Sequence, residues 1–330
     1  MSGIALSAAI VGVENLDSSA AFYRDIVGLE ASPIGHLEGA AFAQHWALPA
    51  AATARAQVFS MPGVDVGRVV LLEFAAPQRV QVRRPGETTI RGLWNLNFYV
   101  SDIRSTCRDL TALGFQLWSD PVSYEVSGKS GHPTEALFEG PDGVVINLVE
   151  LNGSPDTVIG RVRAAADRVG RTRTGWSAVA TTSHSVGNVD AAIAFYREVV
   201  GLQVLMDEVL AKSETNHFLK RPANGRTRAV FMAADHPFGK IALSHNLNYD
   251  VPDHVGDARA PNIGYLAQSF RVAQLDAAVA RAIATGASIE SARLTVDAWG
   301  TGSPAPAVLL RNPGSGALMQ LVQKSILSPQ

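Results

Sequence analysis

The chain repeats itself along its length, and this internal repeat limits the possible folds more strongly than any other feature. Residues 13–24 match residues 186–197 without a gap, which relates two halves of the chain by an offset of 173 residues. A polar residue that follows a strand-like segment, called here the anchor, also recurs at spacings of 87, 86 and 86 residues. The anchors are Asn15, Asp102, Asn188 and Gln274. The sequence therefore predicts four tandem modules of about 86 residues.

Each module has the same predicted order of elements. A strand such as residues 8–13 ends at an anchor that can cap a helix. The helix carries apolar residues at helical spacing and is followed by a glycine such as Gly28, which is typical of a helix end. Strand-like segments follow, for example residues 56–61 and 67–75. Because a lone βαβββ module would leave one sheet face uncovered, we expect an α+β fold in which the four modules pair into two open-barrel domains around cavities.

The connecting segments suggest the domain limits. The first domain is expected at residues 1–151, with modules at about 1–77 and 92–151, and the second at residues 176–325, with modules at about 176–247 and 262–325. The segment between them, residues 152–175, contains five arginines. A basic binding patch is one reading of this segment, and a solvated linker helix is the favoured one.

Composition argues against several classes of partner. The net charge is −2 and 18% of the residues are charged, so nothing in the composition favours nucleic acid or a membrane surface. The apolar runs have the length of strands, well short of the ~20 residues of a membrane-spanning helix. Cys107 is the single cysteine, and the first residues lack the features of a signal peptide. We therefore expect a cytoplasmic protein, monomeric or homodimeric.

The motifs of the first module resemble a known superfamily. A strand and an anchor, followed by Ala-Phe-Tyr-Arg at 21–24 and Val-Gly-Leu at 27–29, are similar to the opening of a vicinal oxygen chelate module. Residues 67–74 and 140–148 resemble its closing strands. That superfamily includes glyoxalase I, type I extradiol dioxygenases, certain epimerases and the bleomycin-resistance proteins. The resemblance implies a divalent metal between paired modules, bound by a His seven residues before the anchor and a Glu on the last strand.

The positions that the resemblance assigns to metal ligands mostly hold other residues. The first-strand positions are Ala8, Asn95, Thr181 and Ala267, and the last-strand positions are Glu73, Asn147, His245 and Gln320. Amides and hydroxyls are weak ligands for a divalent transition metal. No metal site of the family type and no cofactor are therefore expected, with a divalent metal retained as an alternative.

The same positions supply the candidate site residues. Glu73, if desolvated in a cavity, would have a raised pKa and could act as a general base, and His245 could act as acid or base near neutral pH. A salt bridge to Arg68 or Arg91 is the structural alternative for Glu73. The predicted contacts to a small polar or aromatic molecule are Asn95, Asn147, Thr181, Gln320, His45 and His217.

Three functions remain open at this point. The first is a small-molecule enzyme of the superfamily, a lyase, isomerase or ring-processing enzyme, with degraded metal ligands. The second is a protein of the bleomycin-resistance type that binds or sequesters a small molecule without catalysis. The third is a metal-dependent, extradiol-type dioxygenase that uses other ligands, such as Glu214, His217 and His245.

Overall fold

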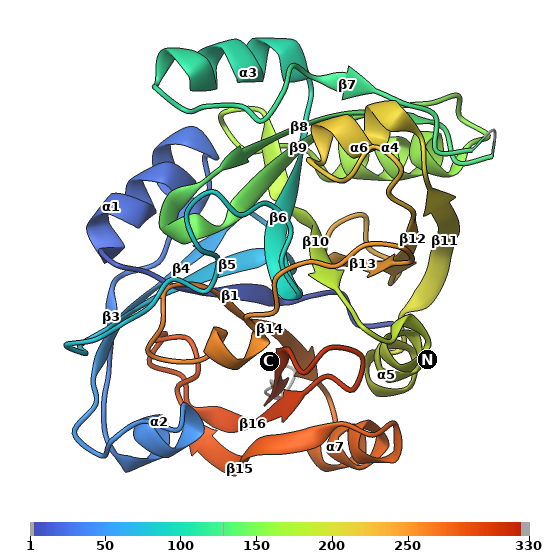
Figure 1. The fold of residues 1–330 in the computed structure, drawn as a ribbon. Coiled ribbons are helices and arrows are strands. Elements are labelled where there is room, and N and C mark those ends of the chain that lie inside the picture. The colour runs from blue at the N-terminus through green and yellow to red at the C-terminus, as the bar shows by residue number, and fades with distance from the viewer. Residues whose placement is uncertain (1–2, 128, 325–330) are drawn as a thin grey trace.

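The computed structural model describes residues 3–127 and 129–324, and it confirms the α+β fold built from four related modules (Figure 1). Two curled, mostly antiparallel sheets make up most of the molecule, with the helices placed around them. Within the described residues, no helix is long and apolar enough to cross a membrane.

The two modules of the first half contain the following elements. Module 1 comprises β1 (Ala8–Gly12), α1 (Leu16–Ala21), the π-helical turn η1 (Phe22–Ile26), β2 (Glu30–Ala31), β3 (Gly35–Leu37), α2 (Ala40–His45), β4 (Ala54–Ser60) and β5 (Arg68–Phe74). Module 2 comprises β6 (Gly92–Val100), α3 (Ile103–Ala112), β7 (Val122–Ser123), β8 (His132–Glu139), the 3-10 turn η2 (Pro141–Gly143) and β9 (Val145–Asn152).

The second half repeats this order after the connecting helix α4 (Val158–Val169). Module 3 comprises β10 (Trp176–Ser185), α5 (Val189–Val200), β11 (Gln203–Leu210), α6 (Ser213–Phe218), β12 (Thr227–Ala233) and β13 (Lys240–Asn246). A 3-10 turn, η3 (Val255–Asp257), precedes module 4, which comprises β14 (Gly264–Val272), α7 (Leu275–Ala284), β15 (Ser288–Val296), β16 (Ala305–Arg311) and β17 (Leu318–Gln323).

The anchors begin the module helices, as their recurrence predicts. The Oδ1 atoms of Asn15, Asp102 and Asn188 each accept a hydrogen bond from the backbone N–H three residues later. Each of these bonds satisfies one of the free N–H groups at a helix start. Gln274, the fourth anchor, makes no such bond, because its longer side chain does not suit this geometry.

The modules pair in an order that the repeat does not reveal. One sheet runs β15-β16-β17-β14-β1-β5-β4-β2 and therefore joins module 4 to module 1, while the other runs β11-β12-β13-β10-β6-β9-β8-β7 and joins module 3 to module 2. We call these barrel 1/4 and barrel 2/3. The pairing differs from the expected one, in which modules adjacent in sequence (1–151 and 176–325) share a barrel. The first strands of the four modules have similar sequence patterns. The sequence is therefore equally compatible with pairing between neighbouring modules and with the observed pairing of module 1 with 4 and of module 2 with 3.

Alternation along the strands divides the core into two parts. On β5, Val69 and Leu71 belong to a cluster that packs the convex sides of the sheets against the helices. Val70 and Leu72, which alternate with them, belong to a second cluster, which packs the inside of barrel 1/4 and extends to Leu137 and Val145 of barrel 2/3. This period of two is the property of a strand that sorts its side chains between two faces.

The segment 152–175 is more than a linker. Its helix α4 begins at Thr157, whose Oγ1 accepts a hydrogen bond from the N–H of Gly160. Ile159 is buried, and Val158, Ile159 and Val162 contribute to the lining of a cavity in barrel 2/3. The helix therefore has a solvent-exposed basic face and an apolar face, and the apolar face packs against the sheet.

Candidate functional site

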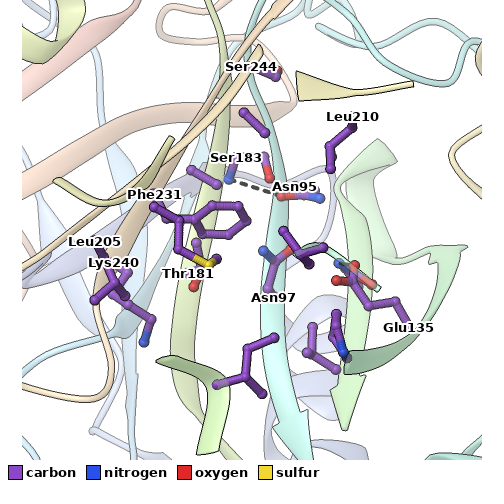
Figure 2. Close-up of a pocket in the computed structure, with 18 of the residues that line it drawn as sticks. Asn95, Asn97, Glu135, Thr181, Ser183, Leu205, Leu210, Phe231, Lys240 and Ser244 are labelled. Atoms are coloured by element: carbon purple, nitrogen blue, oxygen red, sulfur yellow. Dashed lines mark hydrogen bonds between the residues drawn. The ribbon is translucent and has the colours of Figure 1, made fainter. Parts of the chain in front are cut away.

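Barrel 2/3 holds a cavity of about 950 Å³, a volume that includes its open mouth. Asn95, Asn147 and Thr181, three residues singled out in the sequence, line it together although they come from both halves of the chain. Figure 2 shows polar side chains on the central strands and apolar ones, such as Phe231 and Leu205, on one side. The other polar or charged residues of the lining include Asn97, Glu135, Ser183, Arg221, Lys240 and Ser244.

A row of polar residues crosses four neighbouring strands of the concave wall. Thr181 on β10 pairs with Lys240 on β13 and, on its other side, with Asn97 on β6. Asn97 in turn pairs with Asn147 on β9. Side chains on neighbouring strands at paired positions stand about 5 Å apart, so these four form a continuous band. The amide oxygens of Asn97 and Asn147 are shielded from solvent and have no hydrogen-bond partner in the described chain.

Glu135, on β8, continues this band with a carboxyl group. Its Oε1 accepts a hydrogen bond from the Tyr124 hydroxyl at 2.7 Å, and its Oε2 accepts one from Nδ2 of Asn147, also at 2.7 Å. Burial raises the pKa of Glu135 above its usual value, although the two hydrogen bonds oppose the shift by stabilising the carboxylate. Glu135 is therefore an acid that can hold its proton at a higher pH than an exposed glutamate.

Arg221 brings a positive charge to the same cavity. It lies just after α6, in a loop that Asn216 holds by donating to the backbone oxygens of Ala223 and Gly225. The Nε and Nη1 atoms of Arg221 are shielded from solvent and have no hydrogen-bond partner among the described residues, and no carboxylate of those residues forms an ion pair with its guanidinium. Burial lowers its pKa, while the electrostatic effects of Tyr249, Tyr124 and Glu135 oppose that shift. Arg221 and Glu135 influence each other electrostatically, but no ion pair joins them in the described chain, and the carboxylate oxygens of Glu135 accept from Tyr124 and Asn147.

Glu73 and His245 lie outside the cavity because they occupy a different register on the last strands from Asn147 and Gln320. The parallel pairs Ile10–Val70, Asn97–Asn147, Ser183–Ala242 and Ser269–Gln320 are equivalent in the four modules. Asn147 and Gln320 thus occupy the inward position. Glu73 and His245 lie three residues beyond the equivalent position, and an odd step along a strand places a side chain on the opposite face.

Residues at this later position hold the start of each module helix. Glu73 Oε2 accepts the backbone N–H of Leu16, and Glu150 Oε2 accepts that of Ile103, both at 2.8 Å. Nδ1 of His245 lies 3.1 Å from the backbone oxygen of Val186, and Nε2 of Gln323 donates to that of Ala273. Glu73 also pairs with Arg55, and not with the expected Arg68 or Arg91. Neither Glu73 nor His245 faces a cavity, contrary to expectation.

Gln320 and His45 meet inside barrel 1/4, where side chains occupy the interior. Gln320 Oε1 accepts hydrogen bonds from Ser269 Oγ at 2.7 Å and Trp299 Nε1 at 3.1 Å, and its Nε2 lies 2.9 Å from Nε2 of His45. Both Gln320 and His45 are fully buried, and burial lowers the pKa of His45 to about 4. Phe42 and Trp46 fill the space beside them. These contacts give both residues a structural role in the core, and not the expected ligand contacts.

The alternative metal ligands do not converge. Glu214 and His217 are exposed on α6, so His217 is not at the predicted contact in the cavity. His245 faces the start of a helix. Among the described residues, no group of three His, Cys, Asp or Glu side chains is arranged to hold a metal ion. At the inward positions that the family uses, barrel 2/3 offers Asn95, Asn147 and Thr181. Such neutral donors do not fit a divalent transition metal, so no step of a mechanism is assigned to one.

Sequence reasoning missed Glu135, Arg221 and Lys240, which are the acidic and basic residues of the described cavity lining. The motif of the superfamily marks the first and last strands, whereas Glu135 lies on a middle strand and Arg221 in a loop. A signal was present for Lys240, because it alternates with Ala242 and Ser244 along one face of a strand. A lysine on the inward side of a buried strand is rare enough to indicate a site.

Comparison with known proteins agrees with this architecture. The model of the Glyoxalase/Bleomycin resistance protein/Dioxygenase superfamily matches residues 5–148 and 178–303. Glyoxalase I from Zea mays is similar in structure, with a TM-score of 0.61 and 13% identity over 97% of this chain and 92% of that chain. A putative dioxygenase from Bacillus subtilis gives a TM-score of 0.55 and 11% identity, over 98% of this chain and 86% of that one.

A search of curated proteins found no match. Likeness to solved structures at these identities concerns the fold and does not extend to the reaction. The family model, in contrast, covers most of both halves, from β1 into β9 and from β10 through β15. The chain belongs to the Glyoxalase/Bleomycin resistance protein/Dioxygenase superfamily.

Proposed function

We propose that the chain binds a small organic anion with an apolar body in the cavity of barrel 2/3, using side chains in place of the family's divalent metal. The observation that carries this proposal is the Arg221 guanidinium, which lines the cavity without an anionic partner in the described chain. A shielded, unpaired charge is costly, and a ligand carboxylate, sulfonate or phosphate would remove that cost.

The charge balance of the cavity supports an anionic ligand. Among the described lining residues, Arg221 and Lys240 are basic and Glu135 is acidic. Burial raises the pKa of Glu135 and so opposes a negative charge there, which leaves the Arg221 guanidinium as the charge that an anionic ligand would meet. The amide oxygens of Asn97 and Asn147 and the hydroxyl of Ser244 add unpartnered polar atoms that suit donor groups on the ligand.

The apolar side of the cavity sets the second requirement. Leu205, Met206, Leu210 and Phe231 come from the outer strands β11 and β12 and also line the cavity, and Figure 2 shows Leu205 and Phe231 on the side of Thr181 and Lys240. Ligand pockets commonly combine such walls with a few polar groups that orient the ligand. An aromatic or alicyclic anion meets both conditions, whereas a fully hydrated inorganic ion meets the first alone.

Fluorescence titration with 8-anilinonaphthalene-1-sulfonate, an aromatic anion, tests this function. We expect saturable binding that weakens at least about tenfold in Arg221→Leu, because a hydrogen bond to a charged group contributes about 1.5–3 kcal/mol. The neutral analogue N-phenyl-1-naphthylamine should bind wild type and Arg221→Leu alike. Arg226→Leu, an exposed arginine five residues along the chain, is the matched control and should change neither titration.

Two outcomes would overturn parts of this proposal. Failure of wild type to bind either probe would remove the cavity as a binding site. Equal weakening of the charged and the neutral probe in Arg221→Leu would show that Arg221 shapes the cavity and does not recognise the anion.

Acid–base catalysis is a second candidate, favoured by the environment of Glu135. A carboxyl group with a raised pKa, hydrogen-bonded to a tyrosine hydroxyl, can transfer a proton to or from a bound substrate, as a lyase or isomerase requires. The C3 protons of 4-phenyl-2-oxobutanoate, exchanged into D2O and followed by NMR, provide the assay. Catalysis predicts faster exchange than in buffer and its loss in Glu135→Gln. Binding of this acid with no acceleration would favour sequestration of the bleomycin-resistance type.

A further inference from the structure

Lys240 occupies an unusual place for a lysine. It begins β13, pairs with Thr181 of β10 and lines the cavity of barrel 2/3, with 3% of its surface exposed. The chain contains five lysines, and the other four are exposed: Lys129, Lys212, Lys220 and Lys324. Figure 2 shows the Lys240 side chain on the same wall as Thr181. A buried lysine normally has an anionic partner.

The partners of the Lys240 amine are neutral. Its Nζ donates to the backbone oxygen of Pro237 and lies 5.0 Å from the centre of the Tyr99 ring. No carboxylate of the described chain forms an ion pair with it. Lys240 also acts on the neighbouring element at His236, whose pKa is lowered mainly by burial and further by the Lys240 charge. Both the low exposure and the absence of a counter-charge therefore disfavour the ammonium form.

This environment changes the chemistry of the amine. Burial lowers the pKa of Lys240 from 10.5 to about 7, although the Pro237 oxygen and the Tyr99 ring both favour the charged form. Near pH 7 a large fraction of such an amine is neutral, against about one part in 2,500 for an exposed lysine with a pKa of about 10.4. The neutral amine is the nucleophile, and desolvation in a pocket is a recognised way to activate a lysine.

We infer that Lys240 is a carbonyl-reactive amine, which forms an imine with an aldehyde or ketone admitted to the cavity of barrel 2/3. The inference rests on the proposed function in so far as the cavity must admit an organic ligand. The Nζ lone pair forms the new bond to the carbonyl carbon, and the carbonyl oxygen accepts protons and leaves as water with both N–H hydrogens of the neutral amine. A C=N bond replaces the C=O bond, and no oxidant or reductant takes part in this step.

Reductive trapping tests the inference on the wild-type protein. The protein is treated at pH 7 with benzaldehyde or with 4-carboxybenzaldehyde in the presence of cyanoborohydride, which reduces an imine to a stable amine. Peptide mass spectrometry then gives the labelling rate of each of the five lysines. We expect Lys240 to be labelled at least about tenfold faster than any of the four exposed lysines.

The pH dependence provides a second signature. Above pH 7 the neutral fraction of Lys240 approaches its limit, whereas that of an exposed lysine still rises about tenfold per pH unit. The rate advantage of Lys240 should therefore fall steeply between pH 7.5 and pH 9.5. Urea at an unfolding concentration should abolish the advantage altogether, and saturating 8-anilinonaphthalene-1-sulfonate should reduce it without affecting the exposed lysines.

The outcomes separate this inference from the proposed function. Labelling of Lys240 no faster than the exposed lysines, in a protein that binds the naphthalene probes, would overturn the carbonyl-reactive amine and leave the binding site intact. Absence of probe binding together with slow labelling would overturn both. Faster labelling by 4-carboxybenzaldehyde than by benzaldehyde, lost in Arg221→Leu, would support both and place the anion and the carbonyl in one ligand.

Discussion

Asn147 donates a hydrogen bond from Nδ2 to Oε2 of Glu135 at 2.7 Å, and so joins the last strand of module 2 to its neighbour inside barrel 2/3. Leu137 lies directly opposite Asn147 in the sheet, which makes Glu135 its diagonal neighbour. Asn147 occupies a position that the superfamily motif marks, whereas Glu135 does not. Together with the hydrogen bond from Tyr124, this contact holds the acidic group of the cavity in place.

Glu135→Gln should alter how stability depends on pH. Burial raises the folded-state pKa of Glu135 above its usual value of 4.5, so the folded protein retains a proton that the unfolded chain has released. The stability due to this proton is complete below pH 4.5 and is lost as the pH rises through the folded pKa. Relative to the non-titrating variant, wild type should therefore become less stable as the pH rises. Urea unfolding from pH 4 to pH 8 measures this, and parallel profiles would refute it.

Glu73→Ala should destabilise the protein by about 1–2 kcal/mol without weakening binding of the naphthalene probes. The change removes the acceptor of the Leu16 N–H at the start of α1 and the partner of Arg55. Glu150→Ala removes the equivalent acceptor in module 2 and should cost a similar amount. Chemical denaturation and fluorescence titration give the two quantities. A loss of probe affinity in Glu73→Ala with normal stability would restore Glu73 as a site residue.

Gln320→Leu should destabilise the protein by roughly 2–4 kcal/mol and leave barrel 2/3 unaffected. The substitution leaves Ser269 Oγ, Trp299 Nε1 and His45 Nε2 without their partner in a fully buried region. Thermal and urea unfolding report the loss, and the naphthalene probes report the other barrel. Unchanged stability would indicate that the network of barrel 1/4 is dispensable, contrary to its burial.

Removal of metal ions should change neither stability nor probe binding. The inward positions of barrel 2/3 carry amides and a hydroxyl, which are weak ligands for divalent transition metals. Dialysis against EDTA, followed by a thermal melt and a probe titration, tests this. One iron, zinc or manganese per chain in elemental analysis, with a melting temperature that EDTA lowers and the metal restores, would contradict it.

The local interactions were readable from the sequence. Anchor residues at a constant spacing predicted the module starts, and the structure places helix caps at Asn15, Asp102 and Asn188. The alternation of apolar residues and the family motif gave the α+β modules and the superfamily. Three of the predicted contacts, Asn95, Asn147 and Thr181, lie together in the cavity lining. These features depend on contacts within a few residues, or on the period of two of a strand, so a one-dimensional pattern contains them.

Tertiary structure decided which modules meet and therefore which residues share a cavity. Four similar first strands offer four similar edges, and the sequence does not state that β6 pairs with β10 and β1 with β14. The register of the last strands was likewise undetermined, because loops of unequal length separate these strands from the anchors. A shift by an odd number of residues turns a side chain from the cavity face of the sheet to the face that packs against the helix. Arg221 and Glu135 approach the same space from a loop and a middle strand far apart in the chain. Charge and burial at that site arise from packing, which no local pattern records.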